Sequence, residues 1–364
     1  MKIKDKNIAL LGIIFPNLIG NFSLFLYSFS VFYIKIKKIN IVKNLFSINA
    51  TTLTLTYVFF HIAITFILYG ISFNSELKGL IFLAITSLII TNNERTQSIE
   101  KLKTNINIII YYLAFIALLV ATTRGVLFRF PDYNPIKFGL NSIYVGSLFV
   151  LIFAIFKDKY IRIKSSIIIF LAGSGTALSG FILYLGLENF TNLKLLKRNF
   201  FKIIIIFGFI GALFLSFLYT QSLRGRAIDD IGSVDRFILQ TSFFKYYFDN
   251  FSIIKFLFGT TYKGSLLPYL DYLQVPYMRD YLLTRLHDGI ITGKMLHNEH
   301  LRIIFHFGIV GYTIFLRQIF LLINKNKSIF FTIIWMQFFN PIIYVNSTFV
   351  LLILLSNYKW NNRN

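Results

Sequence analysis

The sequence contains no cysteine, and charged residues fill only 14% of its 364 positions. The absence of cysteine excludes disulfide bonds, catalysis by a thiolate and metal sites built on cysteine. The low share of charged residues, beside a hydrophobic share of 56%, excludes an ordinary soluble domain. We therefore expect an all-α polytopic membrane protein, because helices satisfy their own backbone hydrogen bonds inside a bilayer.

Acidic side chains are also scarce, with 15 Asp and Glu against 37 Lys and Arg. In a soluble protein this excess of positive charge would suggest nucleic acid as a partner. In a membrane protein it is typical of the loops that orient the helices and contact membrane lipid or phosphate. The chain begins with basic residues before an apolar run, but no small-residue cleavage site follows. We therefore expect membrane lipid as a partner, no nucleic acid, and a first membrane element at the N-terminus.

Apolar segments alternate with short loops through residues 1–220 and again through residues 301–364. Most segments have about the length of one membrane-spanning helix, roughly 20 residues. Residues 8–34 and 165–187 are each predicted to form a hairpin of two short helices, because a single span would leave basic loops on opposite faces. The other spans are predicted at residues 45–71, 78–91, 105–121, 140–156, 203–220, 301–323, 328–340 and 342–357. The total is about twelve transmembrane helices, with both termini in the cytoplasm.

Residues 221–300 are the one long polar stretch, and they separate the N-terminal helices (1–220) from the C-terminal helices (301–364). This loop carries nine Lys or Arg and eight Asp or Glu, whereas every short loop assigned to the cytoplasm is basic, including residues 157–164. The positive-inside rule therefore places the long loop on the outer, periplasmic face. We expect this loop to carry the active site.

Five arginines lie in the long loop, and three of them, Arg224, Arg226 and Arg236, fall near its start. Residues 236–248 have apolar side chains at helical spacing, which predicts an amphipathic helix on the membrane surface with Arg236 near headgroup depth. A guanidinium donates a planar pair of hydrogen bonds to phosphate and stays charged. A single arginine would more often bind a lipid phosphate, but five in one outer loop favour a phosphate-binding site. Arg285 lies near the end of the loop.

The run HNEHL at residues 297–301 closes the long loop and opens the next apolar segment. A helix beginning near Asn298 would place His297 in one stripe with Gly308 and Gly311, whose lack of side chains allows another helix to approach. His297 would then lie at the outer mouth of a packed seam. A histidine there can take a proton from a hydroxyl near neutral pH, as a general base must. The alternative is a histidine that caps the helix or lies at the membrane interface.

Two further histidines follow in the same helix. His306 lies two turns deeper, near Glu299 and Arg302 in the sequence, and we expect it to be a buried structural partner. His300 is one turn past His297 and faces elsewhere, so its replacement by alanine should have a milder effect than replacement of His297.

Three stretches resemble the O-antigen polymerase and O-antigen ligase family. The run HNEHLRIIFHFGIVG at 297–311 resembles the family's H-N-x-x-L signature followed by G-x-x-G. GSVDRFILQ at 232–240, followed by FLFGT at 256–260, is similar to the arginine segment and glycine turn that precede this signature. RGVLFRFPDYNPIKFG at 124–139 is similar to an earlier outer loop of the family. The twelve-span layout with a large late outer loop also resembles the family. One departure is Gly175, in AGSGTA at 172–177, where many members have an arginine.

The resemblance implies a metal-independent glycosyltransferase of the GT-C kind in the bacterial inner membrane. Its substrate would be an oligosaccharide linked to undecaprenyl diphosphate, used on the periplasmic face, with a chain-length regulator protein as a further partner. Transfer needs a base for the acceptor hydroxyl and positive charge for the departing diphosphate. The implied base is His297, and the implied diphosphate ligands are Arg236, Arg224, Arg226, Arg124 and Arg285. No cofactor and no metal are expected, because the early outer loops carry no carboxylate pair.

Three functions remain open at this point. A polymerase transfers the growing glycan to a new lipid-linked repeat unit, for O-antigen or capsule, and the compact chain with an aromatic-rich loop favours this activity. A ligase transfers the finished glycan to lipid A-core. A transporter of lipid-linked glycan would also have about twelve spans, but it would not require a large outer loop.

Overall fold

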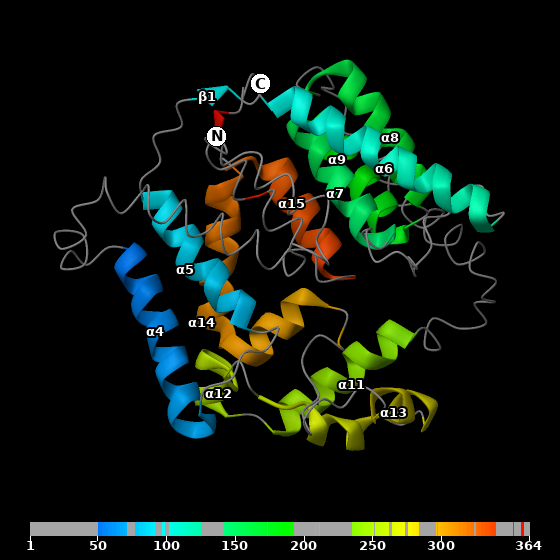
Figure 1. Cartoon of the computed structure of the whole chain (residues 1–364). Coiled ribbons are helices and arrows are strands. Elements are labelled where there is room, and N and C mark those ends of the chain that lie inside the picture. Colours follow the sequence, from blue (N-terminus) through cyan, green and yellow to red (C-terminus); the bar gives the residue numbers. More distant parts are fainter. Residues whose placement is uncertain are drawn as a thin grey trace.

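The computed structural model is all-α over the residues that it describes, as the composition predicts (Figure 1). In these residues there are eleven α-helices, one 3-10 helix and one pair of two-residue strands. The structure describes residues 50–70, 77–91, 97–98, 102–124, 142–172, 174–192, 208, 211, 235–250, 252–261, 264–273, 276–283, 296, 298–323, 325–339, 352 and 358–359. The predicted hairpin at 8–34 lies outside the described residues, as do almost all of the spans predicted at 203–220 and 342–357.

Six predicted helices are present with ends shifted by a few residues. They are α4 (Ala50–Tyr69), α5 (Leu77–Thr91), α6 (Lys103–Arg124), α7 (Ser142–Ile155), α14 (Glu299–Leu322) and α15 (Lys327–Gln337). Among the described helices, α4 and α14 are long and apolar enough to cross a membrane. α5, α7 and the later helix α9 have shorter apolar stretches.

The predicted hairpin at 165–187 is confirmed as two helices, α8 (Lys159–Ala172) and α9 (Gly175–Asn192). Arg162 near the start of α8 donates hydrogen bonds to both carboxylate oxygens of Glu188 near the end of α9, each 2.7 Å long. The two helices are therefore also joined at the ends away from the hairpin tip. The predicted basic loop at 157–164 is largely wrong, because α8 begins inside it. The carboxylate of Asp158 accepts hydrogen bonds from the backbone N–H groups of Tyr160 and Ile161, which stabilises an early helix start.

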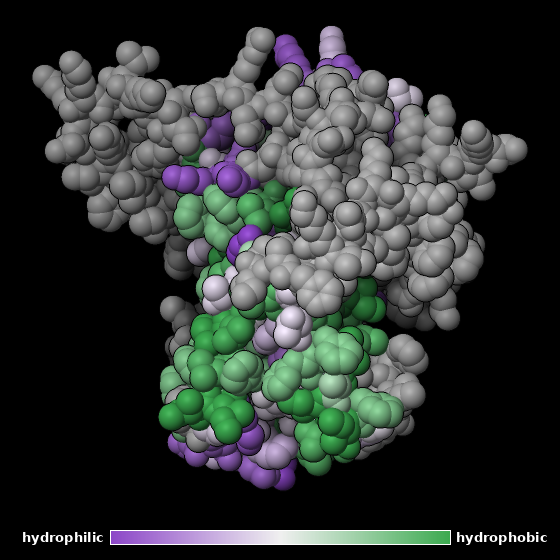
Figure 2. Space-filling model, turned by 90° about the vertical axis from the view of Figure 1, so that its left-hand side faces the viewer, coloured by the Kyte–Doolittle hydropathy of each residue, from purple (hydrophilic) through white to green (hydrophobic). Residues whose placement is uncertain are grey.

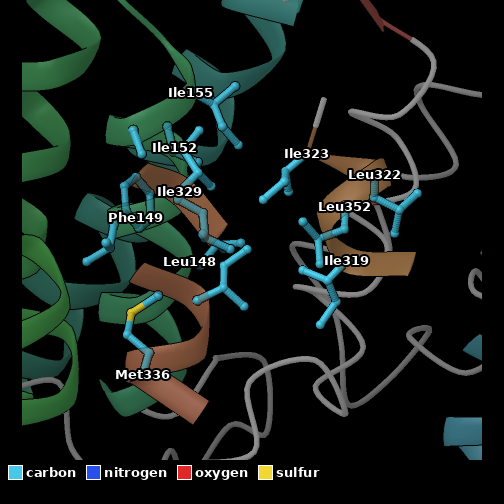
Figure 3. Close-up of a cluster of buried hydrophobic side chains, with 14 of the residues drawn as sticks. Leu148, Phe149, Ile152, Ile155, Ile319, Leu322, Ile323, Ile329, Met336 and Leu352 are labelled. Atoms are coloured by element: carbon cyan, nitrogen blue, oxygen red, sulfur yellow. The ribbon is translucent and has the colours of Figure 1, made fainter. Parts of the chain in front are cut away.

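Helix α7 lies at the centre of the larger hydrophobic core and packs against both α8 and α9. It is apolar all round, as expected of a helix buried on every side. Figure 3 shows Leu148 and Ile152 of α7 facing the end of α14, where Ile319 and Ile323 lie, with Ile329 and Met336 of α15 beside α7. The core therefore ties the C-terminal helices to the middle of the chain.

Two short strands link distant parts of the sequence. β1 (Gln97–Ser98) pairs in parallel with β2 (Tyr358–Lys359). The pair joins the loop after α5 to the C-terminal tail, two segments that the predicted topology places on the same cytoplasmic face. Their contact agrees with that assignment.

Helices from the long loop form a second, smaller core, which we call the platform. It contains α11 (Asp235–Asp249), the 3-10 helix η4 (Leu267–Tyr272) and α13 (Pro276–Leu283). The predicted helix at 236–248 is thus confirmed. Tyr269 lies at the centre of the platform and donates a 2.7 Å hydrogen bond to the carbonyl of Leu239, and burial raises the pKa of its phenol. Leu301 and Phe305 of α14 complete this core, so the platform is packed directly against α14.

Candidate functional site

Helix α14 begins where the sequence predicts, but it is broken in the middle. The side chain of Asn298 accepts a 3.2 Å hydrogen bond from the N–H of Leu301 and caps the helix. Gly308 has φ 64°, which interrupts the helix. In Figure 1 the first part of α14 lies across the bundle, and the rest runs upward beside α5. The predicted continuous stripe from residue 297 to Gly311 is therefore wrong at Gly308.

The break in α14 is crossed by the turn that follows α12 (Ile253–Phe258). This turn contains Gly259, which has φ 78°. A Cβ atom added to Gly259 would overlap the carbonyl of His306, and one added to Gly308 would overlap the carbonyl of Leu257. The two backbones therefore touch, and only glycine fits on either side. The close approach of another helix predicted at Gly308 is confirmed, because the atoms nearest to Gly308 belong to Leu257 and Phe258 at the end of α12.

The carbonyl groups beside the break have partners outside α14. The carbonyl of Phe305 accepts hydrogen bonds from the backbone N–H and the hydroxyl of Thr260, at 2.9 and 3.0 Å. The carbonyl of Phe307 accepts from the hydroxyl of Tyr57 in α4. Interrupted helices are tolerated in a membrane where the protein satisfies the released backbone groups. Gly311 lies directly against Tyr57, so the predicted close approach at this glycine is also confirmed.

His306 is fully buried at the crossing, as the sequence predicts for a structural partner. Its Nδ1 lies 2.9 Å from the carbonyl oxygen of Thr261. Since a carbonyl only accepts, Nδ1 carries the proton, and the lone pair of the neutral ring lies on Nε2. The histidine thus holds the turn after α12 against α14.

His61 of α4 is a buried histidine that the sequence reasoning missed. Its side chain is 3% exposed, and its ring centroid lies 4.7 Å from that of Tyr57 and 5.6 Å from that of Phe307. Neither ring nitrogen has a hydrogen-bond partner in the part of the chain that the structure describes. The hydroxyl of Thr261 is likewise buried without a partner there. The available signal was a histidine inside a long apolar segment, where ionisable residues are rare.

A second set of buried polar side chains lies at the first turn of α14. Glu299 is fully buried and accepts a 2.8 Å hydrogen bond from the amide of Gln337 in α15. Arg302, one turn along the same helix, is also buried. These contacts fix the start of α14 against α15.

The ring of His300 is fixed by a hydrogen bond at each of its two nitrogens. Its Nε2 donates a 2.9 Å hydrogen bond to the carbonyl of Ile334, and in the neutral ring its Nδ1 accepts from the hydroxyl of Tyr312 at 3.0 Å. The ring centroid lies 4.3 Å from that of Phe338. Both nitrogens are thus engaged, so the expectation of a mild effect at this position does not fit the packing.

The residues predicted to carry the chemistry lie outside the described residues, or only their backbone is described. His297 lies outside the described residues, between the buried residues Leu296 and Asn298. Arg236 is the second residue of α11 and Arg124 is the last residue of α6, and the side chains of both are outside the described part. Arg224, Arg226 and Arg285 also lie outside it.

Over the residues that the structure covers, no group of three or more His, Asp or Glu side chains is arranged to hold a metal ion. Comparisons of the chain with models of known families, with curated proteins and with solved structures found no match.

Proposed function

We propose that this chain is a membrane-embedded, metal-independent polymerase of surface-polysaccharide repeat units. It transfers the growing O-antigen or capsule glycan from undecaprenyl diphosphate to a new lipid-linked repeat unit, on the periplasmic face of the bacterial inner membrane. The observation that carries the proposal is the position of the HNEHL run. Its residues Asn298 to Leu301 are buried where the platform core meets the start of α14.

The surface of α4 supports a membrane location. Phe59 is 73% exposed and Ile67 is 78% exposed, and most of the other exposed side chains of α4 are apolar too. Contiguous apolar surface of this kind is costly in water but favourable against lipid. Figure 2 views this side of the molecule and shows apolar side chains gathered over its lower half, with a hydrophilic rim beneath them.

The proposed reaction joins the acceptor hydroxyl oxygen to the anomeric carbon of the donor. The bond from that carbon to the diphosphate oxygen breaks, and the diphosphate leaves with the negative charge. His297 takes the hydroxyl proton. The ligands of the diphosphate are Arg236, Arg224, Arg226, Arg124 and Arg285. A general base must be held in a fixed position. The capped helix start at Asn298 and the buried Leu296 provide a fixed backbone on either side of His297.

The decisive experiment uses purified protein in vesicles with a single lipid-linked repeat unit as the only glycan. A polymerase produces a ladder of longer lipid-linked glycans. A ligase produces none unless lipid A-core is added. Absence of new glycan under both conditions would overturn the proposed glycosyltransferase activity.

The broken helix favours a transporter as the second candidate. Discontinuous helices that cross near the middle of the membrane are typical of transporter sites. A transporter would move a fluorescent lipid-linked glycan between the leaflets of a vesicle and leave its length unchanged. Lengthening without movement supports the polymerase.

A further inference from the structure

We propose that residues 252–261, which comprise α12 and the turn after it, lie at the depth of the outer leaflet of the membrane, and that α12 faces lipid acyl chains. The sequence places these residues in the periplasm with the rest of the long loop. The inference rests on the membrane location given under the proposed function, but it does not depend on the reaction catalysed. Its partner is the hydrocarbon of the bilayer.

The contact between α12 and α4 indicates the depth of this segment. The ring of Phe258 lies 5.9 Å from the ring of Phe60. Phe60 precedes Tyr69, the last residue of α4, by nine residues. At a rise of about 1.5 Å per residue, Phe60 lies about 13 Å below the end of the helix, and half of a hydrocarbon core is about 15 Å thick. Since Ile67 near that end is exposed and apolar, the ring of Phe258 lies well inside the hydrocarbon.

The crossing with α14 gives a second measure of depth along α4. The hydroxyl of Tyr57, which donates to the carbonyl of Phe307, comes from a residue that precedes Tyr69 by twelve positions. This distance along α4 is about 18 Å, close to the middle of the bilayer. Gly259 touches the same part of α14. In Figure 1, α12 accordingly lies beside the lower half of α4 rather than beyond its end.

The turn after α12 has its backbone polar groups satisfied within the protein. The N–H of Gly259 donates to the carbonyl of Lys255 at 2.7 Å, and the N–H of Thr260 donates to the carbonyl of Phe305 at 2.9 Å. Non-helical backbone at membrane depth is tolerated where it is buried in protein with its polar groups satisfied. The turn that follows α12 therefore belongs to the protein interior, while α12 itself presents side chains outward.

The outward side chains of α12 fit lipid. Ile253 is 68% exposed and Ile254 is 72% exposed. Phe244 and Phe248 of α11 are also exposed, and their rings stack with centroids 6.4 Å apart. The contact between Phe258 and Phe60 makes this surface continuous with the apolar face of α4. In the proposal, lipid acyl chains cover both surfaces. Exposed Lys255 can extend its ammonium group toward the headgroups while its methylene groups remain in apolar surroundings.

Site-directed spin labelling tests the proposal, because the chain has no cysteine and each variant carries one label. Ile254→Cys is reconstituted in vesicles of phosphatidylcholine and phosphatidylglycerol, and collisions of the label with oxygen and with a water-soluble nickel chelate are measured. Ile67→Cys in α4 reports lipid. Asp271→Cys reports water, since this platform side chain is 73% exposed in a surface ion pair. We expect the oxygen-to-nickel ratio to be several-fold higher at Ile254 than at Asp271, and at least as high as that at Ile67.

The outcomes separate this inference from the proposed function. A label at Ile254 that behaves as at Asp271, while the label at Ile67 behaves as in lipid, overturns the embedding and leaves the membrane protein intact. If the label at Ile67 also reports water, both the embedding and the membrane location fail. Ile253→Cys repeats the measurement at a second exposed position, so a local disturbance at residue 254 does not decide the result.

Discussion

Gly259 and Gly308 hold one backbone crossing from opposite sides. Each has a positive φ, 78° and 64°, and each lies where a Cβ atom would overlap a carbonyl group of the other segment. Both glycines follow a phenylalanine, Phe258 and Phe307. The crossing therefore couples the long loop to α14, the helix that follows it, and to α4.

The first prediction concerns this crossing. Gly308→Ala should lower the free energy of unfolding by about 1–3 kcal/mol or more, because it adds both backbone strain and an overlap with Leu257. Thermal unfolding in detergent measures the change. Gly208→Ala is the matched control, because a Cβ atom there meets nothing within 4 Å. Equal unfolding temperatures for the two variants would mean that the backbones do not touch.

Replacing the two buried histidines at the crossing by phenylalanine should change the stability of the protein in opposite directions. His61→Phe removes two buried nitrogens that have no partner, and we expect stability to be unchanged or to rise by about 1 kcal/mol. His306→Phe leaves the carbonyl of Thr261 without its donor and should cost about 1–3 kcal/mol. Unfolding temperatures of the two variants in the same detergent make the comparison. A large loss in His61→Phe would indicate that a water molecule or ligand satisfies the ring.

His300 should be structurally important. His300→Ala removes two hydrogen bonds and the contact with Phe338, so we expect a loss of about 2–4 kcal/mol and less protein in the membrane. Tyr312→Phe removes only one of the bonds and should cost about 1 kcal/mol. Membrane levels and unfolding temperatures measure both effects. A fully stable His300→Ala variant would contradict the packing seen at this residue.

His297 should affect the reaction instead of stability. Loss of a general base lowers the rate by roughly 10²–10⁴-fold, so His297→Ala should abolish long glycan chains at normal membrane levels. His297→Gln separates the alternatives, since glutamine can replace a helix-capping or interfacial histidine but cannot act as a base. Polysaccharide ladders from a strain that lacks the native protein provide the measurement. Normal ladders from either variant would exclude His297 as the base.

Polymer synthesis should depend on the planar guanidinium group of Arg236. Arg236→Lys keeps the positive charge but loses the paired hydrogen bonds to two phosphate oxygens, and we expect a large loss of polymer. Arg279→Lys is the matched control, because Arg279 forms an exposed ion pair with Asp271. If both variants make normal chains, the diphosphate is bound elsewhere, and Arg124 or Arg285 becomes the residue to test.

Local sequence pattern determined where most described helices lie. The starts of α4, α5, α7 and α15 follow from apolar segments bounded by polar residues, and Asn298 marks the start of α14 through a cap that forms within one helical turn. The hairpin of α8 and α9 followed from the charge on its flanks. These features depend on neighbours in the sequence, so a single sequence is enough to predict them.

Tertiary contacts decided the break in α14 and the burial of His61. Glycine permits a positive φ but does not require it, and Gly308 takes one because the chain around Gly259, about fifty residues earlier, passes directly over it. The sequence alone favoured an uninterrupted stripe. That expectation failed because the backbone groups at the break are satisfied by Tyr57 and Thr260, which lie far away in the sequence.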